Sequence, residues 1–361
     1  MEKTLHKDHY TQSNWFTEEI NHIFHNEWVC VGSEQDLREN GDYKIIDFYG
    51  ESIILLRDND GQLNAFINLC KHRGCELLDT QGSDLSGHLK NKIRCPYHSW
   101  TYNLKGHLIN APHLDIDLND TKFHLNNVKL QTWIGFIFLN LNPDALDLKQ
   151  HLESKIEQFS RYPLEQLIPK VHIPYEIKAN WKVLLENYNE CYHCAGVHPE
   201  LCNIVPAFRK DGGANLEWEE GVPHREGANT FTLSGVTNRK PFPGLNDLEK
   251  ERHFGQALYP NFLISLSMDH VAIFILHPIS ESTTKLDFYI LFHPDSINDD
   301  EFDPSDAEDF WSLTNKQDWK ICEKVQRGMQ SKTFSKGYYG KMEDENLDIR
   351  KYISEKLNIN I

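Results

Sequence analysis

The sequence predicts an α+β protein in which a small antiparallel all-β domain precedes a larger domain of helices and antiparallel strands. Short apolar runs separated by turn residues fill residues 43–140, which is typical of a small β domain. Longer helical and strand patterns alternate after residue 160, and 361 residues are enough for two hydrophobic cores. We therefore expect an N-terminal helical segment at 1–40 that packs on the second domain, a β domain at 41–160 and a mixed domain at 161–361.

The N-terminal segment is predicted to be helical over residues 13–30. Phe16, Ile20, Ile23 and Phe24 recur at the spacing that places side chains on one helix face. This apolar face is the surface that we expect to pack on the second domain.

The β domain is expected to consist of short strands joined by tight turns. The dipeptides Asp60-Gly61, Lys105-Gly106 and Asn142-Pro143 mark turns between these strands. The expected strands are residues 43–48, 51–58, 63–69, 92–97 and 133–140.

The second domain follows a helical pattern at 147–162 and a linker around Pro163 and Pro169. Its expected elements are a helix at 181–194, long antiparallel strands at 262–279 and 285–294, and the longest helix at 308–329. The tail, residues 341–361, is charged and only weakly patterned.

Charge and hydropathy exclude several classes of partner. A net charge of -17 argues against nucleic acid and anionic membrane, and the simplest interpretation of the acidic excess is solubility. No stretch approaches the roughly 18 to 20 apolar residues of a membrane helix, and the N-terminus does not resemble a signal peptide. We therefore expect a cytoplasmic protein whose eight cysteines are ligands or buried thiols rather than disulfides.

Two cysteine- and histidine-bearing segments predict a metal cluster in the β domain. Cys70-x-His72 and Cys95-x-x-His98 supply two thiolates and two imidazoles from two loops. A [2Fe-2S] cluster of the Rieske type uses this set, with two sulfurs on one iron and two nitrogens on the other. A tetrahedral zinc site is the competing interpretation, but zinc sites usually pair cysteines two to four residues apart. A chance grouping of buried cysteine and histidine would not account for Gly74 and Pro96, which fit tight cluster loops.

The segments CKHRG and CPYHSWTY resemble the Rieske domain of the aromatic-ring-hydroxylating oxygenase superfamily. Rieske proteins of respiratory chains carry an additional cysteine in each loop, and the two are joined as a disulfide. Cys75 could supply one of them here, but Tyr97 occupies the other position, which favours the oxygenase branch. The resemblance implies a Rieske domain followed by a helix-grip (START/SRPBCC-like) catalytic domain.

A second histidine pair predicts a mononuclear iron. His193 and His198 could be two members of the two-histidine, one-carboxylate triad of non-haem Fe(II) oxygenases. Their five-residue spacing turns through about 140° on a regular helix, which does not place both rings on one face. Gly196 and Pro199 suggest that the helix loosens there, so that both rings can reach one metal.

The family resemblance implies the remaining site residues. The segment from Gln317 to Gly328 resembles the family's C-terminal helix and makes Asp318 the expected third iron ligand, with Asp309 and Glu323 as local rivals. Glu190 corresponds to an acidic residue that connects a Rieske histidine of one subunit to an iron-binding histidine of the next. Glutamate there, rather than aspartate, is similar to the subset that oxidises carnitine, choline or betaines.

The resemblance also implies the reaction and the partners. A separate flavin/iron-sulfur reductase would deliver electrons from NAD(P)H, because this chain has no glycine-rich dinucleotide fingerprint. We expect a homotrimeric terminal oxygenase, acting as a monooxygenase or dioxygenase, that uses O2 to hydroxylate or oxidatively demethylate a small organic substrate. A quaternary ammonium compound is the first candidate, and an aromatic acid or arene is the alternative. An electron carrier without catalytic iron and a zinc-binding interaction module are the competing classes, which metal analysis would separate.

The resemblance also implies where the substrate pocket lies. The stretches 227–245 and 257–279 resemble pocket-forming regions of the betaine and choline branch, and aromatic rings there could hold a quaternary ammonium by cation–π attraction. Phe231, Tyr259 and Phe262 are the candidates, although aromatic residues on strands are more often core residues. Met268-Asp269-His270 departs from the pattern of that branch.

Overall fold

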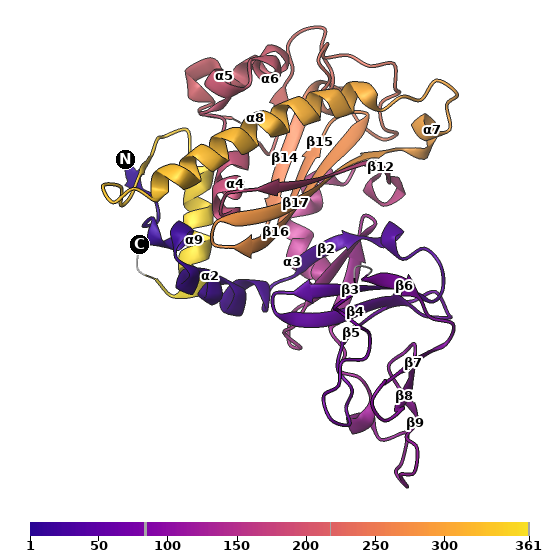
Figure 1. The fold of residues 1–361 in the computed structure, drawn as a ribbon. Coiled ribbons are helices and arrows are strands. Elements are labelled where there is room, and N and C mark those ends of the chain that lie inside the picture. Colours follow the sequence, from indigo (N-terminus) through magenta and orange to yellow (C-terminus); the bar gives the residue numbers. More distant parts are fainter. Residues whose placement is uncertain (83–84, 217, 360–361) are drawn as a thin grey trace. The chain divides into compact units, whose positions relative to one another are not determined.

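The computed structural model describes residues 1–82, 85–216 and 218–359 and divides the chain into two compact units (Figure 1). One unit is Phe24–Leu148, and the other joins Met1–Ile23 to Lys149–Ile361. We predicted boundaries at 40/41 and 160/161 instead. The first difference arises because the expected helix 13–30 ends at Phe24, after which Val29–Ser33 forms a strand of the β unit.

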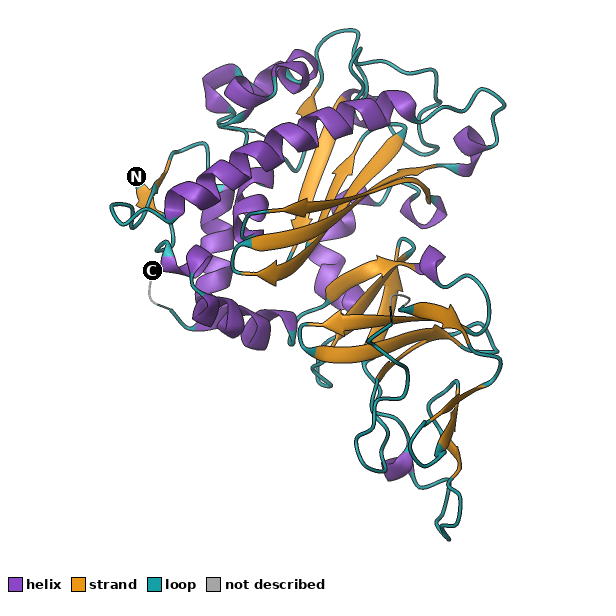
Figure 2. Ribbon diagram, viewed as in Figure 1, coloured by secondary structure: helices purple, strands orange, loops and turns teal. Residues whose placement is uncertain are grey.

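The unit Phe24–Leu148 consists mainly of short antiparallel strands (Figure 2). Three sheets have the strand orders β10-β11-β2, β5-β4-β3-β6 and β7-β8-β9. The strands are β2 (Val29–Ser33), β3 (Asp42–Phe48), β4 (Glu51–Arg57), β5 (Leu63–Ile67), β6 (Ser86–His88), β7 (Lys92–Arg94), β8 (Thr101–Asn103), β9 (Leu108–Asn110), β10 (Lys129–Trp133) and β11 (Phe136–Asn140).

One hydrophobic core of this unit lies directly beneath the two predicted cluster loops. It includes Ile54, Phe66 and Tyr102 together with the cysteines Cys70 and Cys95. The expected turn at Lys105-Gly106 approaches the same core. Gly106 has a φ of +79°, and a Cβ there would lie 2.5 Å from the Phe66 ring, so only glycine fits both the backbone and the space.

The second unit is built on a six-stranded antiparallel sheet with the order β12-β17-β16-β15-β14-β13. The long helix α8 runs across this sheet (Figure 1). The strands are β12 (Ile168–Ile177), β13 (Val222–Pro223), β14 (Arg252–Leu258), β15 (Phe262–Leu266), β16 (His270–Ser280) and β17 (Thr283–Phe292), with the small pair β1 (Glu2–Lys3) and β18 (Tyr338–Tyr339). The helices are α1 (Asp8–Thr11), α2 (Ser13–Glu19), α3 (Leu148–Ile156), α4 (Trp181–Tyr188), α5 (Cys194–Val197), α6 (Pro199–Ile204), α7 (Pro294–Ile297), α8 (Ser305–Met329) and α9 (Glu345–Leu357).

Three expectations for this unit need correction. The predicted helix 181–194 ends at Tyr188, and the predicted strand 262–279 is two strands. A turn separates these strands, in which the Ser267 amide donates to the His270 carbonyl oxygen at 3.0 Å. The weakly patterned tail contains the helix α9, whose buried side includes Ile349 and Ile353. The longest helix, predicted at 308–329, is confirmed as α8, and no helix among the described residues is long and apolar enough to span a membrane.

The N-terminal segment is anchored to helix α4 by buried charged groups. Glu19 and Lys182 form an ion pair whose side chains are both fully enclosed, and Trp181 Nε1 donates to the other Glu19 carboxylate oxygen at 2.7 Å. Removing one partner of such a pair leaves an unpaired buried charge, which costs about 3–5 kcal/mol. The start of the chain is therefore tied to the helix that precedes the predicted iron ligands.

A second buried carboxyl on the same helix predicts a pH-dependent stability. Glu186 Oε1 accepts hydrogen bonds from Tyr10 at 2.6 Å and Tyr339 at 2.9 Å. Burial raises the pKa of Glu186 to about 7, against about 4.5 without burial. The folded state therefore binds the Glu186 proton more tightly than the unfolded state does. This difference stabilises the folded state fully below about pH 4.5, and the stabilisation is lost as the pH rises through 7.

We expect Glu186→Gln to remove this part of the pH dependence, which is at most about 3 kcal/mol. Chemical unfolding of the wild type and the variant at pH 5 and pH 8 measures it. The difference in unfolding free energy between the two pH values should be smaller in the variant. An equal difference in both proteins would contradict the assignment.

Candidate functional site

The four predicted cluster ligands come together at two adjacent loops of the β unit. The first loop follows β5, where the Cys70 amide donates to the Cys75 carbonyl oxygen at 2.8 Å. The second connects β7 to β8, where the Cys95 amide donates to the Trp100 carbonyl oxygen at 2.8 Å. These backbone bonds close both loops into tight turns.

The side chains of these loops fit a [2Fe-2S] cluster. The His72 and His98 rings lie 4.6 Å apart between centroids, and His72 stacks on Trp100 at 5.0 Å. The Nδ1 atom of His72 is buried and has no hydrogen-bond partner within the described chain, as expected of an atom reserved for a metal. Backbone amides of Tyr97 and His98 lower the pKa of the Cys95 thiol although burial opposes this, which favours the thiolate that a metal needs.

The surroundings of the loops distinguish their two sides. Cys70 and Cys95 are buried, whereas His98 lies on the exposed side of its loop. The Tyr102 hydroxyl oxygen lies 3.4 Å from Cys70 Sγ and accepts a hydrogen bond from the Lys71 amide at 3.1 Å. The sulfur ligands are thus inside and one imidazole ligand is outside, so electrons can enter or leave through the imidazole side.

The predicted iron ligands also converge, in the second unit. The ligand atoms of His193, His198 and Asp318 all lie within 4.8 Å of one another. Asp318 Oδ1 is 2.8 Å from His198 Nε2 and 3.3 Å from His193 Nε2. Two imidazoles and one carboxylate on one side of a metal leave coordination positions open for other ligands, so the residues fit a mononuclear iron.

Breaks in the helical path explain how two histidines five residues apart face one point. Helix α4 begins at Trp181, where the Asn180 side chain accepts from the Lys182 amide at 3.0 Å, and it ends at Tyr188. His193 directly precedes the short helix α5, and His198 lies between α5 and α6, whose first residue is Pro199. The expected loosening around Gly196 and Pro199 is therefore observed.

Each of the two histidines is held by a polar partner on its other ring nitrogen. Glu190 Oε1 lies 2.5 Å from His193 Nδ1, and Gln317 Oε1 lies 2.7 Å from His198 Nδ1. Both contacts fix the proton on Nδ1 and leave Nε2 free for a metal. Hydrogen bonds from the two histidines lower the pKa of Asp318 although burial opposes this, so its carboxylate stays charged. Sequence reasoning did not identify Gln317 as a partner, because its role depends on the approach of α8 to α6.

The two local rivals of Asp318 lie elsewhere. Asp309 is exposed on α8, and Glu323 Oε1 accepts from the Lys178 amide at 3.2 Å. The structure thus brings Asp318, and neither rival, to the two histidines.

A cavity of about 380 Å³ adjoins the triad. Its walls are rich in aromatic rings, and the Phe231 ring stacks on Phe310 at 5.2 Å and meets Trp311 edge-on at 5.4 Å. The lining aromatic residues are Tyr188, Phe208, Trp218, Phe231, His253, Phe274, Phe310, Trp311 and Trp319. Most of them were not predicted, because segments far apart in the sequence supply them.

The predicted aromatic cage is only partly correct. Phe231 lines the cavity, whereas Tyr259 and Phe262 are not among its described lining residues. The Lys155 ammonium instead lies 4.7 Å from the centroid of the Tyr259 ring, and this ring also packs on Tyr352. Phe262 is buried in the sheet, in β15. Both therefore have structural roles, the usual outcome for aromatic residues at strands.

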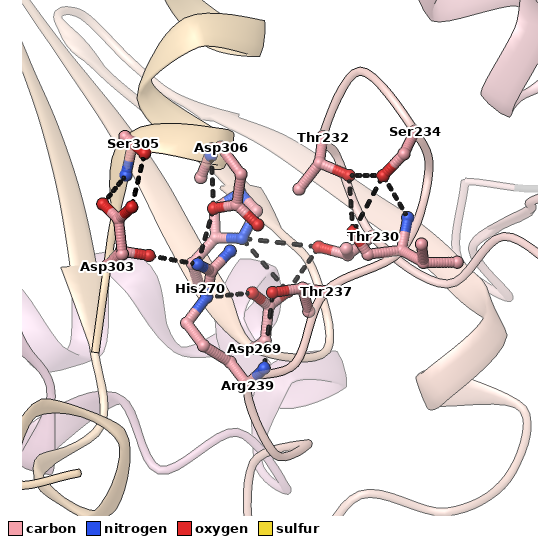
Figure 3. Close-up of polar contacts among 12 residues, drawn as sticks. Thr230, Thr232, Ser234, Thr237, Arg239, Asp269, His270, Asp303, Ser305 and Asp306 are labelled. Atoms are coloured by element: carbon pink, nitrogen blue, oxygen red, sulfur yellow. Dashed lines mark hydrogen bonds and ion pairs between the residues drawn. The ribbon is translucent and has the colours of Figure 1, made fainter. Parts of the chain in front are cut away.

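The unusual Met268-Asp269-His270 sequence supports the cavity wall. Trp311 Nε1 donates to His270 Nε2 at 3.0 Å, so the proton of this imidazole is on Nδ1, which lies 3.1 Å from Asp269 Oδ1. Figure 3 shows Asp269 between His270 and Arg239. Arg239 Nε donates a hydrogen bond to the other carboxylate oxygen of Asp269, Oδ2, at 2.8 Å. Burial would raise the pKa of Asp269, but His270 and Arg239 lower it, so this fully buried carboxylate is charged and orients the Trp311 ring.

Comparisons with known proteins match both units of the chain. The Rieske [2Fe-2S] domain model matches residues 27–127, and the model for the catalytic domain of ring-hydroxylating alpha subunits matches residues 164–358. The carnitine monooxygenase oxygenase subunit of Acinetobacter baumannii is 30% identical over 93% of this chain and 87% of its own length. The glycine betaine monooxygenase oxygenase subunit of Pseudomonas aeruginosa is 28% identical over 94% and 85%. A crystal structure of the quaternary ammonium Rieske monooxygenase CntA shares the fold, with a TM-score of 0.73, 24% identity, and coverage of 98% of this chain and 95% of that one.

Proposed function

The chain belongs to the ring-hydroxylating alpha subunits with a Rieske [2Fe-2S] domain, and from this we propose that it oxidises a quaternary ammonium compound at an N-methyl carbon. It is an oxidoreductase of the Rieske oxygenase type that carries a [2Fe-2S] cluster and a mononuclear iron. As an oxygenase component it works with a reductase, O2 and a small-molecule substrate.

The observation that carries the proposal is the aromatic cavity beside His193, His198 and Asp318. The faces of aromatic rings attract a quaternary ammonium, and the attraction increases when the cation loses its water shell. Curated relatives that span most of this chain act on carnitine and glycine betaine, which both contain a trimethylammonium group. The alternative, hydroxylation of an aromatic acid or arene, has the aromatic walls in its favour, together with a fold shared with naphthalene 1,2-dioxygenase at a lower identity of 17%.

The proposed reaction balances with one molecule of O2, two electrons and two protons. One oxygen atom is inserted into a C–H bond of the N-methyl group, and the other leaves as water. The hydroxymethyl ammonium product then releases formaldehyde and a proton and becomes the demethylated amine. The electrons come from NAD(P)H through the reductase, for which we propose a flavin/iron-sulfur protein.

The site residues of this chain have distinct proposed roles. Cys70, His72, Cys95 and His98 hold the cluster, and His193, His198 and Asp318 hold the iron, which when bound supplies the oxygen chemistry. Glu190 and Gln317 keep the two iron-binding imidazoles in the tautomer that presents Nε2. The aromatic walls hold the substrate and exclude water from it.

We also propose that Glu190 connects subunits of a homotrimer. The exposed position of His98 on its loop leaves this imidazole accessible to another copy of the chain. Glu190 has a second carboxylate oxygen, which accepts from the His193 amide at 3.2 Å and from the Tyr192 amide. A carboxylate that orients His193 and receives His98 of the neighbouring subunit would give electrons a short path between the two centres. None of the eight cysteines forms a disulfide within the described chain, which supports the proposed cytoplasmic location.

The test is a product screen with reconstituted enzyme and a surrogate reductase. Methylammonium compounds should yield formaldehyde and the demethylated amine in equal amounts, dependent on O2 and NAD(P)H. Aromatic acids and arenes are assayed in parallel for hydroxylated products. Hydroxylated arene without formaldehyde from any methylammonium compound would contradict the proposal and favour the alternative.

A further inference from the structure

The charges around the cavity indicate which end groups a substrate can carry. Among the described lining residues there is no lysine and no arginine. Three acidic residues, Glu219, Glu345 and Asp348, line it from exposed positions, the last two on α9. The remaining lining carboxylates, Glu190 and Asp318, belong to the iron site.

The histidines of the cavity do not replace the missing cation. His193 and His198 are iron ligands, which leaves His253. His253 is buried, and burial together with the neighbouring His224 lowers its pKa to about 3. Its imidazole is therefore neutral at physiological pH and can offer a hydrogen bond but no positive charge.

The interior offers neutral donors and ring faces instead. Trp319 Nε1 is buried and has no hydrogen-bond partner within the described chain, and the Asn315 amide is a second neutral donor; both residues line the cavity. Such donors suit a hydroxyl, ether or amide oxygen. Phe231 and Phe310 both line the cavity, and the negative faces of aromatic rings attract a cation and disfavour an anion.

Carnitine and glycine betaine each combine a trimethylammonium group with a carboxylate. A carboxylate that loses its water needs a cation or several hydrogen bonds in return. This cavity has no side-chain cation within the described lining, and the acidic residues at its exposed positions repel an anion. We therefore infer that the cavity takes a methylated ammonium compound whose other end is neutral, such as an alcohol, amide or ester, rather than a carboxylate. The inference rests on the proposed function and names the substrate class within it.

The test uses a matched pair of ligands on the iron-loaded holoenzyme. Glycine betaine and its amide share the trimethylammonium group, size and shape, and differ only in a carboxylate or a carboxamide; choline adds a neutral alcohol. Anaerobic calorimetry gives the Kd of each ligand without turnover, and formaldehyde release in air gives kcat/KM. We expect the amide and choline to bind at least about 10-fold more tightly than glycine betaine.

The outcomes separate the two proposals. Glycine betaine binding as tightly as its amide or more tightly, with formaldehyde release from it, would overturn this inference and leave the proposed function standing. Failure of all three ligands to bind or to release formaldehyde would overturn both.

A variant pair tests the acidic positions on α9. The double substitution Glu345→Gln with Asp348→Asn should narrow the preference of the cavity for the amide over glycine betaine by about 3-fold, because the repulsion of the carboxylate falls. Glu355→Gln removes an exposed charge from the same helix outside the cavity and should leave the preference unchanged. An equal preference in wild type, double variant and control would show that these acidic residues do not select the substrate and would contradict this part of the inference.

Discussion

Replacing Asp318 with alanine should remove the catalytic iron, leave the cluster in place and abolish product formation. The carboxylate is the only acidic member of the triad, and its Oδ1 lies within 3.3 Å of both imidazole Nε2 atoms. Partners behind metal ligands typically contribute 10–100-fold to affinity, so loss of a direct ligand should weaken iron binding by more than about 100-fold. Two imidazoles alone would not retain the metal through purification.

The measurement is metal content together with the visible spectrum of the cluster. Asp318→Ala should lose one iron per chain and keep the absorbance of the cluster, because the cluster ligands lie in the other unit. Asp309→Ala is the matched control, since Asp309 is exposed on the same helix and was a local rival in the sequence. Normal turnover by Asp318→Ala, or loss of iron from the control, would contradict the ligand assignment.

Replacing Glu190 with glutamine should leave both metal centres loaded and slow turnover by about 10–100-fold. Glutamine preserves the size of the side chain but removes the charge that faces His193 Nδ1 at 2.5 Å. The His193 imidazole would still bind the iron, which His198 and Asp318 also hold. In the proposed trimer, the variant would also lose the connection to His98 of the neighbouring subunit.

Single-turnover kinetics distinguish this role from a loss of folding. The reduced cluster is mixed with O2 and substrate, and its reoxidation is followed by absorbance. Glu190→Gln should show full metal content and slow reoxidation of the cluster. Glu323→Gln is the control, because the Glu323 carboxylate on α8 only accepts a hydrogen bond from the Lys178 amide; this variant should reoxidise at the wild-type rate. Wild-type reoxidation in Glu190→Gln would exclude Glu190 from the electron path.

The residues of the two candidate metal sites could be identified in the sequence because most of them lie in short local motifs. Cys70-x-His72 and Cys95-x-x-His98 each occupy one loop, and their spacing alone indicates the cluster. His193 and His198 were recognisable for the same reason, and Gly196 and Pro199 revealed the break between them. Asp318 lies more than a hundred residues further on, and only its resemblance to the family's helix made it identifiable.

Most of the cavity could not be predicted, because its walls form only when distant segments meet, although the predicted stretch 257–279 contributes lining residues such as Phe274. Trp218, Trp311 and Glu345 come from a loop, from α8 and from α9, and no local pattern connects them. Tyr259 and Phe262 were chosen by residue type, and tertiary packing directs them elsewhere. Helix α9 was missed since charged residues dominate its sequence and only one narrow side is buried.

Elemental analysis together with electron paramagnetic resonance measures whether one chain holds both a [2Fe-2S] cluster and a separate mononuclear iron. We expect three irons and two acid-labile sulfides per chain, the third iron being the one that we assign to His193, His198 and Asp318. Reduction with dithionite should produce the signal of a reduced Rieske cluster. Zinc in place of iron, or an iron-loaded protein that shows no such signal, would mean that the chain does not hold these two iron centres.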